Sequence, residues 1–130
     1  MYGFNITLQD SFDNVIKRTI EALKTEGFGV LTDIDVQATL KAKLNIDGRP
    51  YRILGACNPP LAHRAITADP DIGLLLPCNV VVREEPDKKI NVGFMDPIAV
   101  LKLTDNPSIA EVAKEVRGKL ERERDKLAGS

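Results

Sequence analysis

The sequence predicts an α+β domain built on a single antiparallel sheet of about five strands, with helices packed on one face of the sheet. Segments in which apolar and polar residues alternate are interleaved with segments in which apolar residues recur at helical spacing. Two of the expected strands are joined by a loop short enough to require an antiparallel hairpin. With 130 residues, 43% of them hydrophobic, the chain is long enough for one domain, residues 1–130, and too short for two of ordinary size.

The chain is predicted to begin with a strand followed by a helix. In residues 2–8 every second side chain is apolar, which is typical of a strand with one buried face. Apolar residues then fall at helical spacing, namely Phe12, Val15, Ile16, Ile20 and Leu23. Asp10 or Ser11 precedes this helix as a capping residue, and Gly27 is placed to end it.

A second strand, a short helix and a third strand are predicted next. Residues 28–34 are apolar and β-branched enough for a strand. Asp35 follows as the cap of a short helix. The apolar residues of this helix recur at every fourth position, namely Val36, Leu40 and Leu44. Turn formers over 45–50 separate it from a third strand over 51–57.

The middle of the chain is predicted to hold a short helix and a hairpin. Asn58 caps a helix over 61–67, because the two prolines that follow it lack the N–H groups that a first helical turn leaves unpaired. Residues 72–84 predict one long strand with a bulge or edge position at Pro77, which cannot donate to a ladder. A short charged loop then turns the chain into a strand over 90–94.

The C-terminal part is predicted to end in a long helix. The run Ile98–Leu101 fits a helical turn or a strand end equally well. Asn106 and Pro107 begin the last helix, whose apolar stripe comprises Ile109, Val112, Ala113, Val116 and Leu120. Charges alternate over 121–126, so we expect a solvated end or an oligomer contact. Oppositely charged residues four apart add a little stability, namely Arg117 with Glu121 or Glu115 with Lys119.

The predicted helices cover one face of the sheet and leave the other face to be explained. The third strand has apolar residues in both alternations, Leu54 and Ala56 on one face and Ile53 and Cys57 on the other. We therefore expect this second face to be covered either by another copy of the chain in a homodimer or by a small-molecule ligand.

Composition and charge exclude several classes of function. The chain has 18 Lys and Arg residues against 19 Asp and Glu residues. Its net charge of -1 lacks the positive excess that is typical of proteins that bind nucleic acid. The six aromatic residues are not interleaved with basic ones, as a stacking surface for single strands requires. The sequence contains neither a membrane-spanning run nor a signal peptide, so we expect no membrane and a cytoplasmic location, with both cysteines reduced.

Two blocks of the sequence each contain a Cys-Asn pair. Residues 51–62 read YRILGACNPPLA, and residues 69–84 read DPDIGLLLPCNVVVRE. With Phe94–Pro97, these blocks resemble the central signature of the bacterial and archaeal domain-of-unknown-function family DUF302, and the resemblance covers nearly the whole chain. It implies a TATA-binding-protein-like arrangement in a dimer, and it implies no established activity.

The two Cys-Asn blocks predict a binding site for a small ligand or a metal ion. We expect this site to be formed by Cys57, Asn58, His63, Cys78 and Asn79. If the strands that carry the two cysteines are neighbours, both thiols and the single histidine could meet. Cys57, Cys78 and His63 would then hold zinc or another thiophilic metal and leave a fourth position open.

Three other readings of the same residues stay open. Buried cysteines are commonly packed as small hydrophobic residues without any chemistry. One cysteine could instead be a reactive thiolate assisted by His63, in a thiol-dependent enzyme. The domain could also be a structural or interaction module that uses the uncovered sheet face and the charged last helix.

Three aspartates lie beside prolines and allow a further site. Asp69, Asp71 and Asp96 have carboxylates that could bind a hard cation or transfer protons. Aspartate next to proline is also an ordinary turn or capping residue, and we favour that interpretation.

Overall fold

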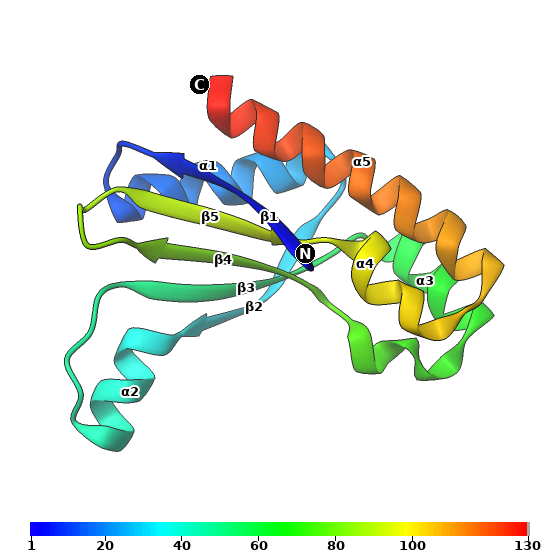
Figure 1. Ribbon diagram of the computed structural model, residues 1–130, viewed down its shortest axis with the longest axis horizontal. Coiled ribbons are helices and arrows are strands. Elements are labelled where there is room, and N and C mark those ends of the chain that lie inside the picture. The colour runs from blue at the N-terminus through cyan, green and yellow to red at the C-terminus, as the bar shows by residue number, and fades with distance from the viewer. Residues whose placement is uncertain (130) are drawn as a thin grey trace.

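The computed structural model describes residues 1–129, which form one five-stranded antiparallel sheet in the order β1-β5-β4-β3-β2 (Figure 1). The strands are β1 (Gly3–Leu8), β2 (Gly29–Asp35), β3 (Tyr51–Cys57), β4 (Cys78–Glu84) and β5 (Ile90–Met95). The helices are α1 (Phe12–Thr25), α2 (Val36–Leu44), α3 (Pro59–Ala68), α4 (Pro97–Leu101) and α5 (Pro107–Gly129), with 3-10 turns η1 (Pro70–Leu75) and η2 (Lys102–Thr104). The predicted α+β class with a single antiparallel sheet is confirmed.

The capping residues predicted from the sequence begin the helices. Ser11 caps α1 by accepting a hydrogen bond from the amide of Asn14 at 3.2 Å. Asp35 caps α2 and Asn58 caps α3 through the same kind of contact. Gly27, with φ of +83°, follows the end of α1 in the left-handed conformation that favours glycine.

The hydrophobic core lies between one face of the sheet and the helices α1 and α5. Both helices run along this face, and α3 and α4 gather at one end of it (Figure 1). The largest fully buried apolar side chains are Phe94, Leu23, Leu54, Ile72, Ile90, Ile109, Leu120 and Leu127. Because side chains alternate along a strand, the residues of each strand that do not point into this core point to the opposite face of the sheet.

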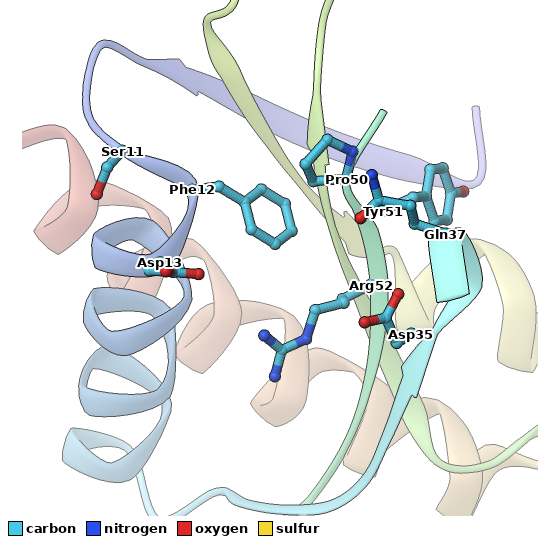
Figure 2. Close-up of a pocket in the computed structure, with 8 residues that line it drawn as sticks. All are labelled: Ser11, Phe12, Asp13, Asp35, Gln37, Pro50, Tyr51 and Arg52. Atoms are coloured by element: carbon cyan, nitrogen blue, oxygen red, sulfur yellow. The ribbon is translucent and has the colours of Figure 1, made fainter. Parts of the chain in front are cut away.

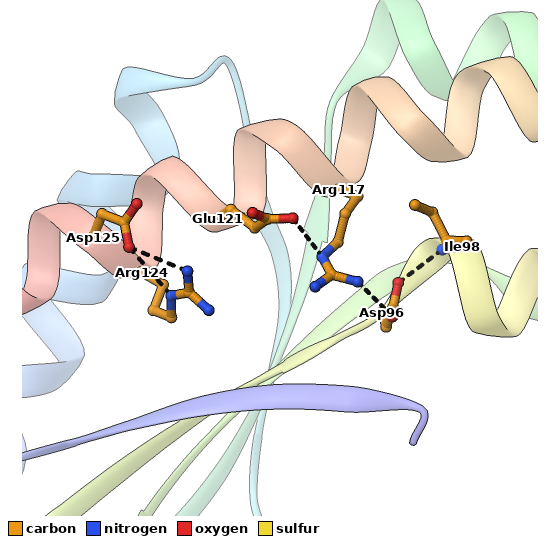
Figure 3. A network of polar contacts seen from close by, with 6 residues as sticks. All are labelled: Asp96, Ile98, Arg117, Glu121, Arg124 and Asp125. Carbon is orange, nitrogen blue, oxygen red and sulfur yellow. Dashed lines mark hydrogen bonds and ion pairs between the residues drawn. The ribbon is translucent and has the colours of Figure 1, made fainter.

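The end of β5 is tied to α5 by a group of charged side chains (Figure 3). Asp96 caps α4 through the amide of Ile98 and accepts a hydrogen bond from Arg117 at 2.6 Å. Arg117 also pairs with Glu121 at 2.8 Å, which confirms one of the two predicted pairs, and its guanidinium lies over the ring of Phe4. Asp96 is therefore a capping residue with a structural ion pair, as we favoured.

The other predicted pair on α5 does not form. Glu115 pairs with Arg64 of α3 at 3.0 Å, in place of Lys119 on its own helix. The expectation of a solvated end over 121–126 is wrong at Glu123, which is fully buried. Glu123 lies three residues after Leu120 and four before Leu127, so it falls on the buried stripe of the helix.

The long strand predicted over 72–84 is wrong in its first half. Residues Pro70–Leu75 form η1, and β4 begins only at Cys78. Asp69 caps η1 by accepting from the amide of Asp71, and the following Pro70 fits a first helical turn. The run Ile98–Leu101, which the pattern left open, belongs to the helix α4.

The helix α2 lies apart from the rest of the structure, beyond the end of β2 (Figure 1). It was predicted from an apolar stripe, yet none of its nine described residues is buried. Leu44 and Ile46 leave 61% and 48% of their surfaces exposed, and Leu31 and Ile34 of β2 are exposed as well. The helix is held by its cap at Asp35 and by a hydrogen bond from Gln37 to the carbonyl of Gly48 at 2.7 Å.

Candidate functional site

The sheet face opposite α1 and α5, which we call the open face, is set by the register of the strands. In β4, Val80 and Val82 are fully buried beneath the helices, so Asn79 and Arg83 point to the open face. Tyr51 of β3 lies opposite Arg83 in the register and shares this face. The central strands thus present polar and charged side chains where a core would be apolar.

A depression of about 420 Å³ lies on the open face. Its lining comes from the three strands β1, β4 and β5 and from the start of β3, together with the two residues that precede β1. Polar groups in it come from Asn5, Tyr51, Asn79 and Arg83, and apolar groups from Tyr2, Val81 and Met95. Gly93 on β5 adds no side chain to it. The volume suits a small organic molecule.

A row of hydrogen-bonded amides stiffens one side of this depression. Asn5 donates to Asn91 at 3.3 Å, and Asn91 donates to the hydroxyl of Thr7 at 3.2 Å. Asn91 is 6% exposed and lies opposite Arg83 in the register of β4 and β5. These bonds hold the amides in place before any ligand arrives.

The two cysteines lie on neighbouring strands but on opposite faces of the sheet. Cys78 pairs with Ala56 in the register, and Cys57 is the next residue along β3, so its side chain points the other way. Cys78 is buried under the helices, and burial raises the pKa of its thiol to about 12. Burial also raises the pKa of Cys57. Neither thiol is activated as a thiolate at neutral pH.

The two asparagines of the Cys-Asn blocks have different surroundings. Asn58 is buried, and its side chain accepts from the amide of Leu61 at 3.3 Å and donates to the carbonyl of Glu26 at 3.2 Å. It joins the start of α3 to the end of α1, which is a structural role. Asn79 is exposed and lines the open-face depression.

His63 lies away from both Cys-Asn blocks. It is exposed on α3 and lines a surface groove of about 530 Å³ between α3 and α5, together with Thr67, Ser108 and Glu111. Neither cysteine lines this groove. The five residues predicted to form one site are therefore divided between the open face, the helix-covered face and the groove.

The residues proposed as metal ligands are not brought together. Among residues 1–129, no group of three His, Cys, Asp or Glu side chains is arranged to hold a metal ion. Cys57 and Cys78 point to opposite faces and His63 lines a separate groove, so these three do not fit zinc or another thiophilic metal.

Comparison with known proteins agrees with the sequence blocks. The family model described as "Domain of unknown function DUF302" matches residues 4–127. The chain belongs to the DUF302 family. A crystal structure of an uncharacterized conserved DUF302 protein from Bacillus stearothermophilus is 30% identical, with a TM-score of 0.89 over 97% of this chain and 98% of that one. No curated protein matches the chain.

A second depression of this DUF302 protein lies on the other side of the sheet, near the starts of α1 and α2 (Figure 2). It measures about 370 Å³, and Phe12 points across it towards Arg52. The guanidinium of Arg52 donates two hydrogen bonds to Asp33, which raise its pKa. The one cation that lines this depression is therefore committed to an internal ion pair.

A buried carboxyl group lies on the helix-covered side. Both oxygens of Glu123 and the hydroxyl of Thr19 are buried without a hydrogen-bond partner among the described residues. Burial, together with the charge of Glu26, raises the pKa of Glu123 to about 8. The carboxyl group is therefore mainly protonated at neutral pH.

Sequence reasoning missed Tyr51 and Arg83 as parts of a site. Both belong to the blocks that carry the family resemblance, and Asn79, Val81 and Arg83 alternate on one face of a single strand. That alternation was a usable signal. None of the helices described in residues 1–129 has the length and apolar character needed to cross a membrane.

Proposed function

We propose that this DUF302 protein binds a small organic molecule in the open-face depression. The convergence of Tyr51, Asn79 and Arg83 on one depression with apolar walls carries the proposal. Small-molecule sites combine an apolar lining with a few placed polar groups, and their volumes are of this order. Glu26 and Leu61 already occupy the polar groups of Asn58, so Asn79 is the asparagine of the two Cys-Asn blocks that is available to a ligand.

Ligand binding accounts for the geometry better than thiol chemistry does. A thiol-dependent enzyme needs a lowered cysteine pKa and a base within hydrogen-bond reach. Cys57 and Cys78 both have raised pKa values, and His63 lines a different groove. The open face, in contrast, offers an arginine, a phenol and an amide on adjoining strands.

Amide NMR with a library of neutral and charged fragments tests the proposal. We expect binding fragments to shift the amides of Val81 and Gly93. A leucine at Gly93 should fill the depression and abolish these shifts, because a Cβ there meets only Asn5, at 3.8 Å, and Asn91, at 4.0 Å. Gly73→Leu is the matched control, since a Cβ at Gly73 has no atom within 4 Å among the described residues.

Three results would contradict the proposal. One is a screen in which no fragment shifts an amide of the open face. Another is a set of fragments that shift the groove beside His63 in place of the open face, which would favour a site on α3 and α5. The third is retained binding in Gly93→Leu, since the fragments would then not occupy the open-face depression.

We also propose that the protein forms a homodimer through α2 and the exposed part of β2. A helix of nine residues gains little stability by itself, and α2 exposes Leu40 and Leu44. The preceding strand β2 exposes Ile34 and is the last strand of the sheet, so one of its edges is unpaired. A second copy supplies the same exposed apolar residues and the same edge, as a two-fold interface requires.

Light scattering coupled to size exclusion tests the dimer. We expect the mass of a dimer for the wild type and of a monomer for Leu44→Lys. Leu103→Lys is the matched control, because Leu103 is 78% exposed and belongs to η2, away from α2. A monomeric wild type at high concentration would rule out this assembly.

The location that we propose is the cytoplasm. Both cysteines are free, and their placement on opposite faces of the sheet prevents a disulfide between them, which suits a reducing compartment. Cell fractionation should recover the protein with cytoplasmic markers, and recovery in a secreted fraction would contradict the proposal.

A further inference from the structure

We infer that the open-face depression is selective for a small monocarboxylate with an apolar body. The inference rests on the ligand site proposed above and names the class of molecule that the site takes. It follows from the charge, the spacing and the apolar surface of the residues that line the depression.

Arg83 is the only charged side chain in the lining of this depression, as far as residues 1–129 are concerned. A lining with a cationic side chain and no carboxylate attracts an anion and disfavours a cation. The terminal ammonium of Met1 also lies at the lining, but Met1 is fully exposed to solvent. The single charge of the half-buried Arg83 therefore makes the close contact, and it matches a monoanion. A phosphate dianion would keep one charge uncompensated, and phosphate sites commonly gather several cations or helix N-termini.

The guanidinium of Arg83 is available to such an anion. Its ion pair within the described chain is with Glu85, whose Oε2 lies 3.9 Å from Nη2, which is longer than a hydrogen bond. The Arg83 side chain is 37% exposed, so its charge is partly desolvated. In contrast, Arg52 and Arg117 make close hydrogen-bonded pairs with Asp33 and Asp96.

The neighbours of Arg83 suit a planar carboxylate. Two parallel N–H donors of a guanidinium match the two oxygens of a carboxylate. Tyr51 lies directly across from Arg83 in the register, and its phenol can donate to an oxygen beside the guanidinium. Asn79 is on the same face of β4 but four residues from Arg83, which is about 13 Å along the strand. It therefore lies beyond the carboxylate and faces another part of a bound molecule.

The rest of the lining favours an apolar body on the same molecule. Val81 lies between Arg83 and Asn79 on this face of β4, and its partner on β5 is Gly93. Because Gly93 has no side chain, the floor of the depression beside Val81 is flat. Met95 adds apolar surface to the lining. An aromatic or aliphatic group of modest size would cover Val81 while its carboxylate reaches Arg83.

Titration with four related probes, followed by amide NMR, tests the inference. The probes are phenylacetate, its neutral analogue phenylacetamide, the cation phenethylamine and the dianion phenyl phosphate. We expect phenylacetate to shift the amides of Val81 and Gly93 and to bind about tenfold more tightly than phenylacetamide, since a charge-assisted pair distinguishes them. We expect phenethylamine to bind least.

Variants connect this preference to Arg83. Arg83→Gln should reduce the affinity for phenylacetate about tenfold and leave phenylacetamide nearly unchanged. Arg83→Lys should keep part of the preference, because the charge remains while the two-donor fork is lost. Arg64→Gln is the control, since Arg64 is an exposed arginine on α3 that pairs with Glu115. Dispersed amide spectra establish that each variant folds.

The outcomes separate the inference from the ligand site on which it rests. Equal affinity for phenylacetate and phenylacetamide, in the wild type and in Arg83→Gln, overturns the carboxylate preference and leaves a ligand site on the open face. Tighter binding of phenyl phosphate than of phenylacetate overturns the preference of the site for a monoanion. If no probe shifts the open face and the fragment screen is also negative, both proposals fail.

Discussion

Glu123 provides a sharp test of the packing between α5 and the sheet, because its carboxyl group is buried without a partner among residues 1–129. Burial raises its pKa from the ordinary value of 4.5 to about 8 in the folded protein. An acid with a raised pKa stabilises the folded state fully below its unfolded pKa. That stability is lost as the pH rises towards the folded pKa.

The magnitude follows from the size of this shift. Each pH unit between the two pKa values costs about 1.4 kcal/mol of unfolding free energy. Between pH 4.5 and pH 7 the folded protein therefore loses about 3 kcal/mol through this one group. Glutamine has the shape of the protonated acid and does not titrate, so Glu123→Gln should be about 3 kcal/mol more stable than the wild type at pH 7. Near pH 4.5 the two should be about equally stable.

Urea unfolding followed by circular dichroism at several pH values measures this difference. Other acids titrate as well, and the lowered pKa values of Asp10 and Glu26 make stability fall as the pH falls. The difference between wild type and variant removes these shared contributions. Glu111→Gln, at an exposed position of α5, is the control and should follow the wild type at every pH.

Two results would refute the reasoning about Glu123. Parallel stability curves for wild type and Glu123→Gln would mean that the carboxyl group is solvated in the folded protein. A variant that is less stable than the wild type at pH 7 would mean that an ionised carboxylate makes favourable contacts there.

Three further predictions concern the residues that position the site. Cys57 should react with a disulfide reagent more slowly than free cysteine, and Cys78 should react only on unfolding, because burial raises the pKa of both thiols. Fast labelling of either cysteine would favour the thiolate mechanism. Asn58→Ala should cost about 1–2 kcal/mol of unfolding free energy, and Asn58→Ser less because its hydroxyl keeps the cap without burying a charge beside the carbonyl of Glu26; equal losses would argue against capping. Gly55→Ala should lower the free energy of unfolding by about 1–3 kcal/mol, because the added Cβ would collide with the hydroxyl of Thr32. In thermal unfolding, adding Thr32→Ala to this variant should restore part of the lost stability. An unchanged loss would mean that the collision with Thr32 is not its cause.

Local sequence signals predicted most of the elements correctly. Ser11, Asp35 and Asn58 were identifiable as caps because capping depends on residues within one helical turn. The strand over 72–84 failed because a short apolar run has no period that separates a strand from a helical turn. The cap at Asp69 was the local signal that favoured η1.

The arrangement of the candidate site was harder to predict because it depends on pairing between distant strands. Whether Cys57 and Cys78 share a face is decided by the pairing of Ala56 with Cys78, and a shift of one residue would reverse it. Glu123 was predictable, since it continues the stripe of Leu120 and Leu127, but the surrounding charges suggested a solvated end.

The position of a bound probe on the protein tests the proposed ligand site most directly. Nuclear Overhauser effects between phenylacetate and the protein report protons in direct contact. We expect effects from the ring of phenylacetate to the methyl groups of Val81, and to the ring of Tyr51 beside Arg83. Effects to the methyl groups of Val112, in the groove with His63, and none to Val81 would contradict it.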